Sequence, residues 1–161
     1  MKKHQGEYSR SFYLLALLLI IVFLVSCRDR LNEKKIANLT YETSSFGVIS
    51  EAAIIDLDEK TQKIFNNEDF RKGGEPNEIT EIPEKNFKTY KIKNIEALRK
   101  EIQGTKVNEW KKEYIDKQMM DGSQWNITIK YTDQTSKSIY GSNKAPKEMK
   151  ELNQLLFGIN E

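Results

Sequence analysis

The stretch of residues 125–131 constrains the fold more than any other part of the chain. Every second residue in it is apolar, and the apolar positions are Trp125, Ile127, Ile129 and Tyr131. The residues between them, Asn126, Thr128 and Lys130, are polar. Because successive side chains of a strand point to opposite faces of a sheet, this period predicts a strand with one buried face and one wet face. Such strands are typical of antiparallel sheets that are packed on one side only.

Signals on either side of this strand predict an α+β domain. A β-rich hairpin is expected within residues 46–65, with a bulge or break near residues 50–53, and further strands at residues 87–92 and 137–141. Helical spacing predicts helices near residues 94–115, capped by Asn94, and 146–157, starting at Pro146. We therefore expect an antiparallel sheet of about four or five strands with two helices packed on one face.

The N-terminal part of the chain has a different character. Residues 14–26 carry no charge, follow the basic residues Lys2, Lys3 and Arg10, and end at the chain's single cysteine, Cys27. The apolar run has about the length of a signal-peptide core and is shorter than the roughly 20 residues that span a bilayer. A single-pass anchor with a short span is the alternative interpretation.

The end of that run carries a family signature. Leu24, Val25, Ser26 and Cys27 resemble the lipobox of bacterial lipoproteins. The resemblance implies that the Cys27 thiol carries a diacylglyceryl group and that the signal is cut just ahead of it. Two acyl chains hold a soluble domain on a bilayer, where one would be marginal. We expect a domain exported from the cytoplasm and lipid-anchored to the cell membrane or outer membrane.

This interpretation divides the chain into three parts. Residues 1–26 are the lipoprotein signal peptide, residues 27–45 are the lipidated cysteine with a flexible tether, and residues 46–161 are a single α+β domain. Of 26 Lys and Arg, three lie in residues 1–26, and of 24 Asp and Glu, one does, which leaves 23 of each in the rest. A formally neutral body gives no reason to expect a nucleic-acid partner.

The same division limits the chemistry of the mature chain. The only histidine, His4, lies in the leader, and the only thiol is the lipidated one. Without them, nucleophilic triads, histidine acid–base catalysis and typical zinc sites are excluded, and we expect no catalytic residue, cofactor or metal site. Carboxylate-only chemistry, such as a glycosidase pair or a calcium site, remains open. Its candidate pair is Asp121 and Asp133, both of which occupy turn positions.

A second resemblance covers about residues 90–157. Its motifs are Trp110 and Tyr114, Asp121-Gly122 followed by Trp125, and Gly141-Ser142-Asn143 followed by Pro146. They are similar to a small domain of uncharacterised bacterial lipoproteins with the pattern W-x3-Y, DG-x-x-W and GSN-x-x-P. Ala145 departs from that pattern, which has an aromatic residue before the proline. The resemblance implies no activity and no catalytic residues.

The residues of these motifs allow two interpretations. In the functional one, a binding surface is formed by Trp125, Tyr131, Tyr140 and Asn143. In the structural one, Gly141 permits a close backbone approach, Asn143 bonds local backbone and Pro146 starts a helix. The sequence leaves this choice open.

We expect a membrane-anchored lipoprotein that acts as a non-catalytic binding or interaction module at the cell envelope. Its partners would be the membrane, through Cys27, and a protein. Two alternatives remain: an immunity-type protein that protects the cell by binding another protein, and a carboxylate-dependent hydrolase.

Overall fold

A computed structural model describes residue 13 and residues 34–72, 74–119 and 122–159. The lipobox and Cys27 lie outside the described residues, so the expected lipid anchor stays a prediction. Within the described part of the chain, no helix is long and apolar enough to cross a membrane. The fold below is that of the compact unit Lys35–Glu161.

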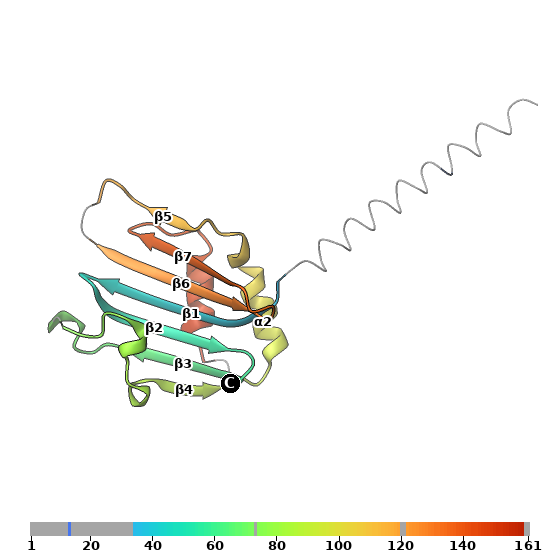
Figure 1. Ribbon diagram of the computed structural model, residues 1–161, viewed down its shortest axis with the longest axis horizontal. Coiled ribbons are helices and arrows are strands. Elements are labelled where there is room, and N and C mark those ends of the chain that lie inside the picture. Colours follow the sequence, from blue (N-terminus) through green and yellow to red (C-terminus); the bar gives the residue numbers. More distant parts are fainter. Residues whose placement is uncertain (1–12, 14–33, 73, 120–121, 160–161) are drawn as a thin grey trace, which may run out of the picture. The chain divides into compact units, whose positions relative to one another are not determined.

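Seven strands form one mixed sheet in the described residues (Figure 1), in the order β4-β3-β2-β1-β6-β7-β5. They are β1 (Ile36–Ser45), β2 (Val48–Asp56), β3 (Thr61–Asn66), β4 (Lys88–Lys91), β5 (Glu113–Ile115), β6 (Ser123–Tyr131) and β7 (Ser136–Ser142). Neighbouring strands are antiparallel, except that β5 runs parallel to β7. The α+β class is as expected, but the sheet has more strands than the predicted four or five.

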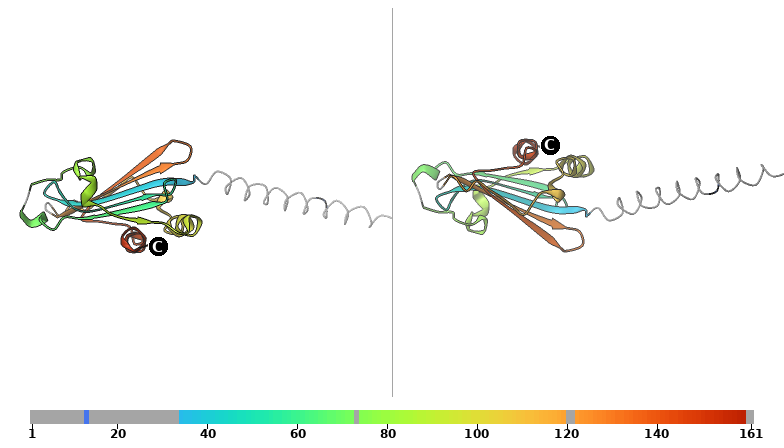
Figure 2. Two further views of the ribbon diagram at one scale, coloured as in Figure 1. Left: turned by 90° about the horizontal axis from the view of Figure 1, so that it is seen from below. Right: turned by 90° about the horizontal axis from the view of Figure 1, so that it is seen from above.

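In the described part of Lys35–Glu161, the helices are α2 (Ile95–Gly104) and α3 (Met149–Phe157). Both lie on the same side of the sheet (Figure 2). Asn94 caps α2 as predicted, because its Oδ1 accepts a hydrogen bond from the Ala97 backbone N–H at 3.0 Å. Short 3₁₀ turns complete the fold: η1 (Phe70–Lys72), η2 (Ile79–Glu81), η3 (Glu84–Asn86) and η4 (Val107–Glu109).

The tether predicted for residues 27–45 is wrong from Ile36 onward. Residues 36–45 form β1, which pairs with β2 on one side and β6 on the other. Ile36, Leu39 and Tyr41 are each at most 3% exposed and belong to the core. The polar residues between them face the other side of the sheet, and their Asn, Thr and Ser content looks like a linker in the sequence. The folded unit therefore begins about ten residues earlier than predicted.

The helical piece predicted for residues 107–115 is also wrong. Lys106 has φ +56°, which ends the helical path, and only the short η4 follows before β5. Trp110 is buried with its indole N–H donating to the Thr105 carbonyl at 3.1 Å, and Tyr114 packs on Trp125 from β5. The four-residue spacing of these aromatics therefore reflects two separate core contacts.

Two predictions on strands are confirmed. Trp125, Ile127, Ile129 and Tyr131 are each at most 6% exposed, so the alternating strand has one buried face. The bulge predicted near residues 50–53 lies at Ser50, because Thr43 pairs with Glu51 while Ser44 pairs with Ile49.

The core lies between the sheet and the helices. Leu39, Ile127 and Ile129 from the sheet pack there with Leu152 and Leu156 from α3. A smaller cluster of Ile49, Ala52, Phe65 and Ile82 lies on the other face, beneath the segment of residues 67–87. Figure 2 shows that this segment and the helices lie on opposite sides of the sheet. It covers β2 and β3, and it leaves the far face of the neighbouring strands open.

Candidate functional site

The sheet separates the four residues of the predicted binding surface. Trp125 and Tyr131 lie in the core on the helix side, each 6% exposed. Tyr140 is half-buried on the opposite face, where it pairs with Asn126. Asn143 follows the end of β7 and lines a hollow of about 270 Å³ together with Trp125. The structure therefore brings Trp125 and Asn143 together, but Tyr131 and Tyr140 do not line that hollow.

The buried members of that set are held by specific hydrogen bonds. The Trp125 indole N–H donates to the Lys144 carbonyl at 2.9 Å, and the Tyr131 hydroxyl donates to Asn108 Oδ1 at 3.0 Å. Burial raises the pKa of Tyr131, and the nearby Asp133 carboxylate raises it further. Both aromatic side chains thus support the fold.

The Gly-Ser-Asn corner supports the packing of Trp125. A Cβ on Gly141 would lie 2.0 Å from Cε2 of the Trp125 ring, so only glycine leaves room for the indole. Asn143 has φ +53°, and its side chain fills the space beside Gly122. The helix start predicted at Pro146 is wrong, because α3 begins at Met149. The Pro146 carbonyl accepts a hydrogen bond from the Met149 N–H at 3.2 Å in the turn before α3. This geometry favours the structural interpretation of the corner.

The proposed pair of carboxylates is not brought together by any described contact. Asp133 lies in the β6–β7 turn, where one oxygen of its carboxylate accepts hydrogen bonds from the Thr135 backbone N–H at 3.0 Å and the Thr135 hydroxyl at 2.5 Å. Asp121 lies outside the described residues. Asp133 therefore has the turn role that its position in the sequence indicated.

A polar surface, which we call the open face, is formed by the outward side chains of β1, β6 and β7. In the register of the sheet, Thr40 lies opposite Thr128, and Glu42 lies opposite Asn126, which in turn pairs with Tyr140. Successive side chains of a strand point to opposite faces of the sheet, and the apolar ones here point to the helices. The side chains on the open face are therefore mostly polar. In Figure 1, the described part of residues 67–87 lies on the side of β2, β3 and β4 and away from β6 and β7.

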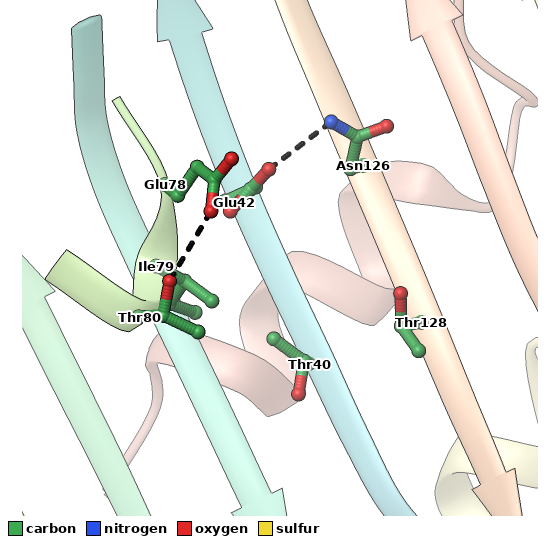
Figure 3. A pocket seen from close by; sticks show the side chains of 7 residues that line it. All are labelled: Thr40, Glu42, Glu78, Ile79, Thr80, Asn126 and Thr128. Atoms are coloured by element: carbon green, nitrogen blue, oxygen red, sulfur yellow. Dashed lines mark hydrogen bonds between the residues drawn. The ribbon is translucent and has the colours of Figure 1, made fainter. Parts of the chain in front are cut away.

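A hollow of about 250 Å³ lies where the open face meets the segment Glu78, Ile79 and Thr80 (Figure 3). Its lining residues are Thr40, Glu42, Glu78, Ile79, Thr80, Asn126 and Thr128. Glu78 and Thr80 reach toward the strands from η2, while the other polar side chains stand up from β1 and β6. The hollow thus combines three segments whose lining residues are 36 to 88 positions apart in the sequence.

Hydrogen bonds fix the orientation of the hollow's side chains. Asn126 Nδ2 donates to Glu42 Oε1 at 3.1 Å across the two strands. The Thr80 hydroxyl donates to Glu78 Oε2 at 3.3 Å. The Glu81 carboxylate holds the loop itself, because it accepts from the backbone N–H groups of Asn77 and Glu78 at 2.7 and 3.2 Å.

The hollow is suited to a polar ligand group. It offers carboxylate oxygens from two glutamates, hydroxyls from three threonines and one amide, with only Ile79 as an apolar wall. Among the described residues, no group of three or more His, Cys, Asp or Glu side chains is placed to hold a metal ion. The arrangement can therefore bind a hydrogen-bonding or cationic group by direct contacts.

This site was not predicted because two of its seven lining residues lie in the part of the chain assigned to the tether. Asn126 and Thr128 were recognised as the wet face of their strand. Thr40 and Glu42, which complete the surface, show the same alternation with Leu39 and Tyr41. This short alternation predicts a strand with Thr40 and Glu42 on its polar face.

A second concavity of about 790 Å³ lies beside α3, and we call it the α3 groove. It is lined by Glu51 of β2 and by Met149, Lys150, Asn153, Gln154, Phe157 and Gly158. Asn153 Nδ2 donates to the Tyr41 hydroxyl at 3.5 Å, and within the described residues its buried Oδ1 has no partner. Burial raises the pKa of Tyr41, the Asn153 hydrogen bond lowers it, and the Glu51 charge raises it.

Comparison of the chain with protein-family models, curated proteins and solved structures gives no match.

Proposed function

We propose that this chain is a lipid-anchored bacterial lipoprotein and that its folded unit is a non-catalytic binding module at the cell envelope. The partner contacts the open face and places a polar or cationic group in the hollow. The observation that carries the proposal is the hollow itself, where the open face, which the helices do not cover, meets η2. Exposed, preformed polar surfaces of this kind serve recognition.

The anchor places this surface near a membrane. If Cys27 carries the lipid, the eight residues 28–35 link it to the first residue of β1. Fully extended, such a link spans about 30 Å. The folded unit would therefore act within one domain diameter of the bilayer, which favours a partner that is itself in or on the envelope.

The anchor is tested by mass spectrometry of the protein isolated from its native host. We expect a chain that begins at Cys27 and carries a diacylglyceryl thioether. A chain that retains residues 1–26 and has a free thiol would overturn this part of the proposal.

The binding role is tested by capture from native membranes. Thr128→Arg fills the hollow with a long cationic side chain without reaching the core, because Thr128 points away from the helices. We expect the captured partner to be lost from Thr128→Arg and retained by Thr132→Arg, which makes the same change in the exposed β6–β7 turn. Equal capture by both variants would contradict a role of the hollow. The identity of the partner separates a general interaction module from an immunity-type protein.

Carboxylate-dependent hydrolysis is a second candidate, because Glu42 and Glu78 both line the hollow. A hydrolase would lose turnover in Glu42→Gln and in Glu78→Gln while keeping its fold. A binding module would retain its partner in at least one of these variants, since each keeps the size of the side chain and one acceptor oxygen.

A further inference from the structure

The end of the sheet at which β1 starts is built from several segments of the chain. The Leu57 N–H donates to the Ala37 carbonyl at 2.9 Å, which places the β2–β3 turn beside the start of β1. The Thr132 N–H donates to the Lys35 carbonyl at 3.0 Å, which places the β6–β7 turn there as well. The chain that comes from Cys27 enters the sheet at this end, and we call it the proximal end.

Helix α2 lies across the same end (Figure 1). It follows β4, whose last residue pairs with the first residue of β3. From the middle of the helix, Arg99 Nε donates to the Ile36 carbonyl at 3.2 Å. Beyond the helix, Lys137 Nζ donates to the Asn108 carbonyl at 2.7 Å, which ties η4 to β7. The proximal end therefore consists of residues 34–38, 56–61, 91–109 and 130–137.

The proximal end carries an excess of positive charge. Its four segments contain ten Lys and Arg and seven Asp and Glu. Glu96 forms an ion pair with Arg99 at 2.6 Å, and Asp56 and Asp133 accept hydrogen bonds from backbone N–H groups of their own turns. Seven exposed lysines of this end form no ion pair with any described residue. They are Lys35, Lys60, Lys91, Lys93, Lys100, Lys106 and Lys130.

The opposite end of the sheet, which we call the distal end, is acidic. The segment of residues 67–87 is held there at the start of β2, because the Ile49 N–H donates to the Pro76 carbonyl at 2.8 Å. This segment contains six Asp and Glu and three Lys and Arg. Since β1 has ten residues, the two ends lie about 30 Å apart. The charge of the folded unit is therefore separated along its strands.

Such a separation of charge orients a chain that is held at a membrane. Anionic headgroups attract each nearby lysine by about 1 kcal/mol, and the attraction decays within a Debye length of about 8–10 Å. Only the end that faces the bilayer lies within this range. Residues 28–35 connect Cys27 to the start of β1, so the proximal end can reach the headgroups. The same headgroups repel the acidic distal end.

From these observations we propose that the folded unit stands on an anionic lipid surface, with the lysines of the proximal end on the headgroups and the segment of residues 67–87 turned away. This proposal rests on the lipid anchor proposed above. The occupant is the bilayer surface because the chain from the anchor enters at this end and because the charges are complementary. In this orientation Glu78 and its side of the hollow point away from the bilayer, where a partner can reach them.

The test uses full-length protein isolated from its native host, because a lipidated Cys27 has no free thiol and an introduced cysteine can then be labelled alone. A fluorophore is attached to Thr132→Cys at the proximal end or to Asn77→Cys at the distal end, both at exposed positions. The protein is placed in vesicles of equal parts phosphatidylglycerol and phosphatidylcholine that contain a spin-labelled headgroup as quencher. We expect severalfold stronger quenching at position 132 than at position 77, and a loss of this difference in vesicles of phosphatidylcholine alone.

Charge-reversing variants separate lipid attraction from mere closeness to the anchor. Lys60→Glu combined with Lys93→Glu changes two exposed lysines of the proximal end. In the anionic vesicles this pair should lower the quenching at position 132 to the level found in phosphatidylcholine. Lys117→Glu combined with Lys144→Glu makes the same change in charge just beyond β5 and β7, at the distal end. This matched pair should not lower the quenching.

Three results would overturn the proposal. They are equal quenching at positions 132 and 77 in the anionic vesicles, quenching at position 132 that persists in phosphatidylcholine, and an equal loss with the two charge-reversing pairs. The anchor is tested separately in the same experiment, because the natural chain takes up no fluorophore when Cys27 is lipidated. Label on the natural chain would overturn the anchor and this orientation together, whereas any of the three results with Cys27 blocked would overturn the orientation alone.

Discussion

The two faces of the sheet differ in what covers them. On the helix side, α2 and α3 enclose one continuous core that includes Leu39, Ile127 and Leu152. On the other side, the cluster around Ile49 and Ile82 occupies only the β2–β3 half, and polar side chains fill the remainder. The first face accounts for the stability of the unit, and the second is available for contact with other molecules. Adjacent residues of one strand can therefore have unrelated roles.

The largest predicted effect is a difference in stability between variants at two neighbouring residues of β6, Ile127 and Thr128. Ile127→Ala should lower the free energy of unfolding by about 3 kcal/mol, because it leaves a cavity in the core where Ile127 is fully buried. Thr128→Ala, on the open face, should change it by less than about 0.5 kcal/mol. Urea unfolding of both variants measures the difference. Similar losses in the two would break the distinction between the faces.

The second effect tests whether the Gly-Ser-Asn corner belongs to the helix-side core. Gly141→Ala should cost about 2 kcal/mol, since the new methyl group overlaps the Trp125 ring and forces it to move. The matched change Gly104→Ala meets no atom within 4 Å and should be neutral or stabilising by up to about 1 kcal/mol. Thermal unfolding and near-ultraviolet circular dichroism of the tryptophans measure both. An undisturbed Trp125 signal in Gly141→Ala would contradict the account.

A smaller effect concerns the turn between β1 and β2, where Phe46 has φ +52°. Phe46→Asn should raise the free energy of unfolding by about 1 kcal/mol, because Asn tolerates the left-handed backbone better. Phe46→Ala removes the same ring but keeps the backbone strain, so it should differ little from the natural chain. Chemical unfolding at low protein concentration separates these cases. Equal stabilisation by both would mean that the backbone at Phe46 is not strained.

The smallest effect is a dependence on pH. Burial raises the pKa of Tyr41 above its usual 10.0. Above pH 10, an unfolded chain loses the Tyr41 proton while the folded chain retains it, so the free energy of unfolding falls as the pH rises. Tyr41→Phe should lose less stability than the natural chain between pH 9 and pH 11. A slope that is identical in both would exclude Tyr41 as a source of the effect.

Features of the fold that depend on a local pattern of residues could be predicted from the sequence. Apolar alternation in β6, the Asn94 cap and the bulge at Ser50 are local patterns, and each is found in the structure. The central strand β1 was missed because its apolar residues are sparse and its polar half resembles a linker. The predicted helical run at residues 107–115 failed because core contacts of Trp110 and Tyr114 from two short elements reproduced a helical spacing.

The candidate site was harder to predict than the fold. The sequence marked Trp125 and Tyr131 because aromatic residues are frequent in binding surfaces, but both are needed in the core. The hollow depends on long-range pairing, which brings Thr40 and Glu42 beside Asn126 and beneath Glu78. The local alternation with Leu39 and Tyr41 marks Thr40 and Glu42 as one wet face, but it does not tell which strand or loop lies beside them. The register of the sheet creates the site.

The central claim is that the open face is the surface that meets another molecule. The most direct test places a photoreactive benzoylphenylalanine at position 128, on the open face, or at position 100, on the exposed side of α2, in full-length protein in native membranes. After irradiation, the account predicts a discrete cross-linked species from position 128 and none from position 100. No species from position 128, or the same species from both positions, would contradict it.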